Sequence, residues 1–189
     1  MRVIGGSARG RILRQPRGTK IRPTSDRVKE ALFNILAGKI EDAIVLDLFA
    51  GTGALGIEAL SRGASRAVFV DRQRDSIILV RRNLLLTGLL PSAELYRQDA
   101  GAALSLFQRQ GRSFDLVFID PPYGEGMTLS ILRKLAQSGV LSSGGVVAVE
   151  HSRKEDLPGR IANLQLWRQR RYGDTVLTFY SREEESNPL

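Results

Sequence analysis

The architecture of this chain follows from one stretch, Ala43-Ile44-Val45-Leu46-Asp47-Leu48-Phe49-Ala50-Gly51-Thr52-Gly53-Ala54-Leu55-Gly56, in which an apolar strand runs into a glycine-rich turn and a helix. The glycines form a G-x-G-x-x-G pattern, which permits a tight turn and close backbone approach to a ligand. Asp71 follows Gly51 by 20 residues, so the dinucleotide fingerprint is formally satisfied. However, Asp47 precedes the glycines, and its charge would repel a pyrophosphate. The stretch therefore favours a cationic cofactor.

Outward from this stretch, apolar runs alternate with helical segments, which predicts an α/β fold: a mostly parallel sheet with helices on both faces. The predicted strands are 43–48, 66–70, 93–96, 114–119 and 145–149. The predicted helices are 54–62, 74–87 and a segment that begins near Asp26 and ends near Gly38. Residues 164–172 and 175–180 alternate around Gly173-Asp174, which predicts a closing antiparallel hairpin.

Aspartates stand at the carboxyl ends of four predicted strands, where ligands bind in a doubly wound sheet. They are Asp47, Asp71, Asp99 and Asp120. Each alone could cap a helix or begin a turn, but four at equivalent positions indicate a ligand site. S-adenosylmethionine (SAM) carries a sulfonium and an ammonium, so a crevice rich in carboxylates suits it.

On this interpretation Asp47 faces the methionine ammonium, directly or through water, and Asp71 accepts from the ribose hydroxyls. Asp99 accepts from the adenine amino group, with the amide of Ala100 in reach. The predicted cofactor-binding set is Asp47, Phe49, Ala50, Gly51, Gly53, Asp71, Arg72, Asp99 and Ala100. Phe49 is expected either in a wall of the site or in the core.

The fourth aspartate begins Asp120-Pro121-Pro122-Tyr123, directly after an apolar strand. Two prolines stiffen the turn and hold its carbonyls as fixed acceptors, beside one carboxylate and one aromatic ring. Two acceptors and a stacking surface suit an exocyclic amino group on a nucleobase. We therefore predict amine methylation, with catalytic roles for Asp120, Pro121, Pro122 and Tyr123. Asp120 and the Pro121 carbonyl orient the amine, Asp120 accepts its proton and Tyr123 stacks on the base.

Composition narrows the class of protein. At 189 residues the chain is expected to form essentially one domain, and the absence of cysteine excludes disulfides and a thiol nucleophile. A single histidine argues against a zinc centre, and no metal is expected. The first ten residues lack the apolar segment of a secretory signal, and no run reaches membrane-spanning length, so a cytoplasmic location is expected.

Positive charge is concentrated at the amino end. Of a formal net charge of +8, residues 1–22 carry seven basic side chains and no acid. A basic patch of this kind is typical of phosphate-backbone contact, although a solvated basic tail remains an alternative. Short β-prone runs around residues 5–10 predict a hairpin that presents the charge. The predicted RNA-binding residues are Arg2, Arg9, Arg11, Arg14, Arg22 and Arg27. The expected organisation is a basic extension (1–22), a catalytic domain (23–181) and a frayed tail (182–189).

Taken together, several blocks resemble the bacterial 16S ribosomal RNA guanine-N2 methyltransferases of the RsmD type. They are Arg2-Val3-Ile4-Gly5-Gly6, Arg9-Gly10-Arg11, residues 22–30, Leu46 to Gly53, the Asp120 to Tyr123 turn and Tyr172-Gly173-Asp174-Thr175. The resemblance implies a class I Rossmann-like methyltransferase fold, SAM as methyl donor and one guanine of 16S ribosomal RNA as acceptor. It also implies that the enzyme binds this RNA within a small-subunit particle. Lys29 stands where arginine is frequent in that family; lysine keeps the positive charge but lacks the bidentate fork of arginine.

Rival functions remain open at this point. The Asp-Pro-Pro-Tyr turn also occurs in DNA adenine-N6 enzymes, so another RNA or DNA is an alternative substrate. A nicotinamide-dependent oxidoreductase and a non-catalytic RNA-binding module are the others. We expect a monomer. Thr24 and Asp26 are expected to cap the first helix, although their position in the family block keeps a contact with cofactor or RNA open. His151 is expected to be structural, and Trp167 to pack in the closing hairpin rather than stack on RNA.

Overall fold

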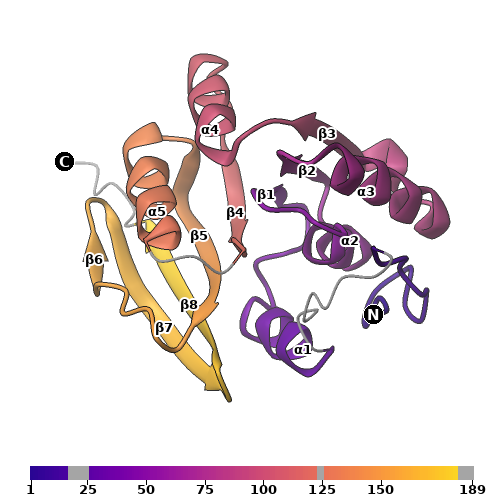
Figure 1. Ribbon diagram of the computed structural model, residues 1–189, viewed down its shortest axis with the longest axis horizontal. Coiled ribbons are helices and arrows are strands. Elements are labelled where there is room, and N and C mark those ends of the chain that lie inside the picture. Colours follow the sequence, from indigo (N-terminus) through magenta and orange to yellow (C-terminus); the bar gives the residue numbers. More distant parts are fainter. Residues whose placement is uncertain (17–25, 123–125, 183–189) are drawn as a thin grey trace.

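A mixed sheet runs through the molecule (Figure 1), which the computed structural model describes for residues 1–16, 26–122 and 126–182. Within these ranges eight strands follow the order β3-β2-β1-β4-β5-β8-β7-β6. They are β1 (Ile44–Asp47), β2 (Arg66–Asp71), β3 (Ala93–Arg97), β4 (Phe114–Ile119), β5 (Leu141–Ser152), β6 (Arg160–Ile161), β7 (Leu164–Tyr172) and β8 (Thr175–Arg182). Strands β1 to β5 pair in parallel, and β8, β7 and β6 continue the sheet antiparallel.

Helices cover both faces of this sheet, as the alternating pattern predicted (Figure 1). They are α1 (Asp26–Ile35), α2 (Ala54–Ser61), α3 (Arg74–Thr87), α4 (Ala100–Arg109), α5 (Met127–Ser138) and the 3₁₀ turn η1 (Leu90–Ser92). Apolar side chains of α1, α2 and α3 pack in one core cluster, and those of α4 and α5 pack in the other. We call these two faces the α1 face and the α5 face. The predicted α/β class with a closing antiparallel hairpin is confirmed.

Close packing of α2 on the sheet depends on one glycine. Every residue of α2 is buried, and a Cβ built at Gly56 would lie 2.3 Å from the ring of Phe69 on β2. No side chain other than hydrogen fits this gap without movement. Gly56 therefore lets α2 lie directly against the strand, which is the role of the third glycine in a nucleotide-binding turn.

Strand β5 differs most from its prediction. It was expected over 145–149 and runs from Leu141 to Ser152, with a register shift against β4: Phe114 pairs with Leu141, but Leu116 pairs with Val146. The residues that precede the predicted start, Ser142-Ser143-Gly144, lie at the bulge and are not apolar, so the apolar run on which the prediction depended did not include them. Strand β6 and η1 were not predicted.

The amino-terminal residues pack on the α1 face. Arg2 and Ile12 form an antiparallel bridge, and Val3 exchanges backbone hydrogen bonds with Gly10 and Arg11. Val3, Ala8 and Leu13 are buried in the same core cluster as α1, α2 and α3. The proposed boundary at residue 22 lies outside the described residues, and β8 extends through Arg182, one residue into the expected tail. None of the helices in the described ranges combines the length and the apolar character that a membrane-spanning helix requires.

Candidate cofactor and substrate site

The glycine loop after β1 is fixed between two neighbouring strand ends. Leu48 donates its backbone N–H to the carbonyl of Phe118 on β4 at 3.1 Å, and Ala50 donates to Val70 on β2 at 2.9 Å. Gly51 and Gly53 have φ of 54° and 79°, a region that favours glycine. The loop therefore lies at the carboxyl edge of the sheet and joins the ends of β2 and β4, where the predicted ligand aspartates stand.

Asp71 ends β2 and holds this loop. Its Oδ2 accepts from the backbone N–H of Gly51 at 2.9 Å, and its Oδ1 accepts from Gln73 at 2.8 Å. The side chain is half-buried, and the neighbouring Arg72 is exposed. A carboxylate has about four lone-pair sites, so two hydrogen bonds leave acceptor capacity for a ligand.

Asp47 lies beneath the loop rather than on its surface. It is 2% exposed and accepts from the backbone N–H of Gly56 at 3.2 Å and from that of Phe49. Burial raises its pKa to about 7, with a smaller contribution from the charge of Asp71, while the two hydrogen bonds oppose the rise. Because the carboxylate is poorly solvated, a cation near the loop would favour its ionised form.

Asp99 caps α4 and stays exposed. Its Oδ1 accepts from the backbone N–H groups of Gly101 and Ala102 at 2.9 and 3.2 Å, and Ala100 is the buried first residue of the helix. No sequence pattern pointed to the preceding residue, Gln98, as part of the site. Its Oε1 is buried and has no hydrogen-bond partner in the part of the chain that the structure describes. An orphaned acceptor next to a proposed ligand carboxylate fits a site that receives a donor from outside the protein.

The proline turn follows β4 at the same edge. Asp120 is half-buried, Pro121 is buried and Pro122 is exposed. Because Phe118 binds the loop after β1, this turn begins beside the glycine loop. The structure therefore brings the glycine loop, Asp71, Asp99 and Asp120 to one edge of the sheet. Tyr123, the predicted stacking residue, lies outside the described residues, as do Arg22 and Thr24.

Phe49 and the arginines also have defined positions. Phe49 is partly buried and packs against the cluster under α4 and α5, next to the buried Ala50. The described members of the predicted RNA set are all exposed: Arg2, Arg9, Arg11, Arg14 and Arg27. The side chain of Arg2 is 67% exposed and lies 3.5 Å from Asp26, in the first turn of α1.

A buried carboxylate holds this basic segment in place. Glu58 on α2 accepts from the backbone N–H groups of Ile4 and Gly5, each at 2.8 Å. It also pairs with Lys29 on α1 at 3.2 Å and with Arg62 at 2.8 Å. Lys29 is fully buried, and its ammonium donates to the carbonyl of Arg2. Lys29 is thus an internal anchor. The signal that could have found it is its spacing of three and four residues from Leu32 and Phe33 on the apolar face of α1, and of seven from Leu36 directly after that helix.

Asn83 on α3 joins the basic segment to the glycine loop. Its amide nitrogen donates to the carbonyls of Thr52, at 2.8 Å, and Arg14, at 3.1 Å. Its oxygen accepts from the backbone N–H of Arg14 at 2.8 Å. The segment that carries the arginines and the proposed cofactor loop are therefore connected through one buried amide.

Two other predicted residues have clear surroundings. His151 is buried, its Nε2 lies 2.8 Å from the hydroxyl of Thr178, and burial lowers its pKa. This arrangement supports the expected structural role. Trp167 packs edge-on against Phe179, with ring centroids 6.0 Å apart, as expected for the hairpin, yet it remains 42% exposed.

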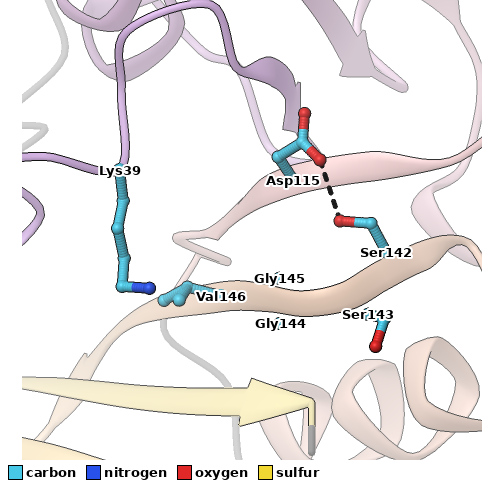
Figure 2. Close-up of a pocket in the computed structure, with 7 residues that line it drawn as sticks. All are labelled: Lys39, Asp115, Ser142, Ser143, Gly144, Gly145 and Val146. Atoms are coloured by element: carbon cyan, nitrogen blue, oxygen red, sulfur yellow. Dashed lines mark hydrogen bonds between the residues drawn. The ribbon is translucent and has the colours of Figure 1, made fainter. Parts of the chain in front are cut away.

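A pocket of about 180 Å³ lies at the opposite edge of the sheet (Figure 2). It is formed where β5 bulges, and Asp115, near the start of β4, lines it together with Ser142, to which it is hydrogen-bonded. Asp115 accepts from the Ser142 hydroxyl at 2.9 Å and from the backbone N–H of Ile44 at 2.9 Å. These contacts join the amino ends of three strands, so the carboxylate has a structural task away from the glycine loop.

Comparisons with known proteins agree with this geometry. Residues 1–181 match the model of a family described as conserved hypothetical protein 95. The Bacillus subtilis protein YlbH is 40% identical over 182 residues, covering 96% of this chain and 99% of YlbH. Ribosomal RNA small subunit methyltransferase D of Escherichia coli is 37% identical over 185 residues, covering 98% and 91%.

Solved structures extend the likeness to three dimensions. The structure of yhhF from Escherichia coli superposes with a TM-score of 0.86 at 38% identity, covering 98% of this chain and 99% of that one. The expected class I methyltransferase fold is therefore confirmed. From the match over residues 1–181 and these identities, the chain belongs to the conserved hypothetical protein 95 family, the family of the RsmD-type ribosomal RNA small subunit methyltransferases.

Proposed function

We propose that this protein transfers a methyl group from SAM to the exocyclic N2 amino group of a guanine in 16S ribosomal RNA. The observation that carries the proposal is the meeting of the glycine loop, Asp71 and the Asp120-Pro121 turn at one edge of the sheet. The printed name of the Escherichia coli relative supports ribosomal RNA of the small subunit as the substrate class.

The residues at this edge fit SAM. Asp71 retains free lone pairs for ribose hydroxyls, and Asp99 uses only Oδ1 for its helix-capping bonds within the described residues, which leaves Oδ2 for the adenine amino group. Gly51 and Gly53 allow close approach of the backbone to the cofactor. Asp47 would attract the methionine ammonium of SAM from below the loop, directly or through a water. A bound ammonium would in turn lower the pKa of the Asp47 carboxyl.

Bound SAM supplies an electrophilic methyl group on a sulfonium. The chain's own task is to make a poor nucleophile react, because the amino lone pair of guanine is delocalised into the ring. Asp120 and the carbonyl of Pro121 accept the two N–H groups and turn the lone pair out of the ring plane. Positioning of this kind lowers a barrier by roughly 7 to 11 kcal/mol when the geometry is good. Asp120 then takes the proton that the amine releases, and Tyr123 stacks on the extruded base.

Exposed arginines of the amino-terminal segment bind the RNA backbone. Arg2, Arg9, Arg11 and Arg14 project from a segment that Glu58 and Asn83 hold against α2 and α3. A fixed segment loses less conformational entropy on binding than a solvated tail would. We place this reaction in the cytoplasm, on a small-subunit particle, with the protein acting as a monomer.

The test is methyl transfer from labelled SAM to small subunits that lack the modification, followed by mapping of the methylated nucleotide. Free 16S RNA and DNA serve as competing substrates, and calorimetry compares SAM with NAD. Asp120→Asn should lower kcat by at least about 100-fold, the usual range for general acid–base catalysis, while SAM affinity stays within about twofold. Asp115→Asn is the matched control, because it changes a carboxylate at the other end of the same strand.

Methylation of a guanine N2 in the particle supports the proposal, and methylation of DNA alone would replace it with the adenine-N6 alternative. Binding of NAD instead of SAM would assign the protein to the oxidoreductases. If Asp120→Asn retains wild-type turnover, Asp120 has no part in the chemistry.

A further inference from the structure

Strand β7 carries exposed positive charge that has no part in the methyl transfer described above. Residues 167–171, Trp-Arg-Gln-Arg-Arg, are all exposed, and β7 contains no acidic residue. In the described part of the chain, Arg168, Arg170 and Arg171 take part in no ion pair with a carboxylate. Among the described residues, Arg170 donates to the carbonyl of Gln169 and Arg171 to that of Gly173, each within two residues along the chain. Their charge is therefore available to a partner.

The strand register sorts these side chains by face. Arg168 pairs with Phe179 and Arg170 pairs with Leu177, and directly opposite residues of an antiparallel pair point to the same face. Phe179 and Leu177 lie in the core cluster of the α1 face. Arg168 and Arg170 therefore share the α1 face of the sheet.

Two further side chains extend this surface. Trp167 packs edge-on against Phe179, so it too lies toward the α1 face, and the ammonium of Lys39 is 5.8 Å from its ring centroid. Lys39 follows α1 and is exposed, with its side chain extended toward Val146 in Figure 2. We call Lys39, Trp167, Arg168 and Arg170 the β7 basic face.

The same register relates this face to the proposed active edge. Val149 on β5 pairs with Ile119 on β4 and with Thr178 on β8. Thr178 also pairs with Gln169 on β7, so Gln169 is level with Ile119. Arg170, the next residue of β7, is therefore level with Asp120, the residue that follows Ile119. Three strand spacings, about 14 Å, separate β4 from β7. The amino-terminal segment lies on the other side of β4, over α2 and α3 (Figure 1).

We propose that the β7 basic face is a second binding surface for the phosphate backbone of the substrate RNA, so that RNA is held on both sides of the Asp120 turn. The inference rests on the proposed function, because it takes RNA as the substrate. An RNA backbone is favoured over an acidic protein because the face combines an exposed aromatic ring with arginines that form no ion pair within the described residues, a combination typical of single-stranded nucleic acid sites. Phosphate contacts at two separated places fix the orientation of the strand between them.

The only tryptophan of the chain lies on this face, so its fluorescence reports contact directly. Protein-free 16S RNA is titrated into the wild-type protein, with correction for absorbance, and affinity is measured across salt concentrations. Arg168→Gln/Arg170→Gln is compared with Arg109→Gln/Arg133→Gln, which removes equal charge from exposed positions on α4 and α5, on the other face. Thermal unfolding of both variants checks that the fold is kept.

We expect RNA to quench Trp167 in the wild-type protein and in the control variant. The β7 variant should bind more weakly, with a salt slope smaller by about 1.4 to 1.8, since each lost phosphate contact removes about 0.7 to 0.9. A slope equal to that of the control overturns the proposal. A tryptophan response to small-subunit particles but none to protein-free RNA would assign the face to a ribosomal protein and also overturn it. Methylation by the wild-type protein is scored separately, so its absence counts against the proposed function and not against this surface.

Discussion

Lys29 and Glu58 lie 3.2 Å apart with both side chains fully buried, and this pair joins α1, α2 and the amino-terminal segment. Burial lowers the pKa of Lys29, and the charge of Glu58 opposes that shift. The Glu58 carboxylate also accepts hydrogen bonds from the backbone N–H groups of Ile4 and Gly5 and from the side chain of Arg62. Because a buried charge is tolerated only with partners of this kind, the pair makes the position of the basic segment part of the folded core.

Glu58→Gln should lower the free energy of unfolding by about 3 to 5 kcal/mol, because it leaves the Lys29 ammonium buried without its counter-charge. Urea unfolding measures the loss. Glu30→Gln, at an exposed position of α1, should change stability by less than about 0.5 kcal/mol. Adding Lys29→Met to Glu58→Gln should recover part of the stability, and no recovery would mean that the ion pair is not the cause.

Asn83→Ala should weaken SAM binding although Asn83 is not proposed to touch the cofactor. The substitution removes the amide that joins Thr52 of the glycine loop to the backbone of Arg14, and unsatisfied buried groups destabilise by about 1 to 3 kcal/mol. Calorimetry with SAM and RNA-binding assays should both report a loss. Asn34→Ala, at an exposed position of α1, is the matched control. An unchanged SAM affinity would contradict the coupling.

Gly56→Ala tests the contact of α2 with β2. The new methyl group would meet the Phe69 ring at 2.3 Å, and overpacking of this kind typically destabilises by about 1 to 3 kcal/mol. Phe69→Leu in the same chain should relieve part of the clash, which a double-mutant cycle measures. Gly159→Ala is the control, since its Cβ meets nothing within 4 Å. Equal destabilisation by both glycine substitutions would count against the steric explanation.

Asp47 should make stability depend on pH. Its pKa is raised to about 7 in the folded protein, from an ordinary value of 3.8, so between these values the folded state binds more protons than the unfolded state. Stability therefore falls as pH rises through this window and levels off above about pH 7.

Asp47→Asn removes this titration and keeps an acceptor for Gly56. Relative to the wild-type protein, the variant should become more stable as pH increases from about 4 to 7, which urea unfolding across pH measures. A stability difference that is constant over this range would show that Asp47 titrates normally. Asp115→Asn is the control at the far edge of the sheet.

The sequence by itself determined the features that depend on near neighbours along the chain. Apolar periodicity located the parallel strands, and the strand-to-helix turn at Gly51 and Gly53 located the loop. Since the carboxyl ends of parallel strands meet at one edge, the positions of Asp71 and Asp120 followed from the strand order alone. These inferences need only local spacing and a rule of topology.

Only the tertiary structure decided which distant residues meet. Asn83 and Arg14 are 69 positions apart, and Glu58 and Ile4 are 54 apart, so no local period connects them. Lys29 shares the apolar stripe of α1 with Leu32 and Phe33, but only the tertiary structure supplies the buried partners, Glu58 and the carbonyl of Arg2, that a lysine needs there. Asp47 was placed beside a ligand by its position at a strand end, but the loop closes over it and shifts its pKa. Burial and partner choice depend on how the elements pack in space, and spacing along the chain does not contain that information.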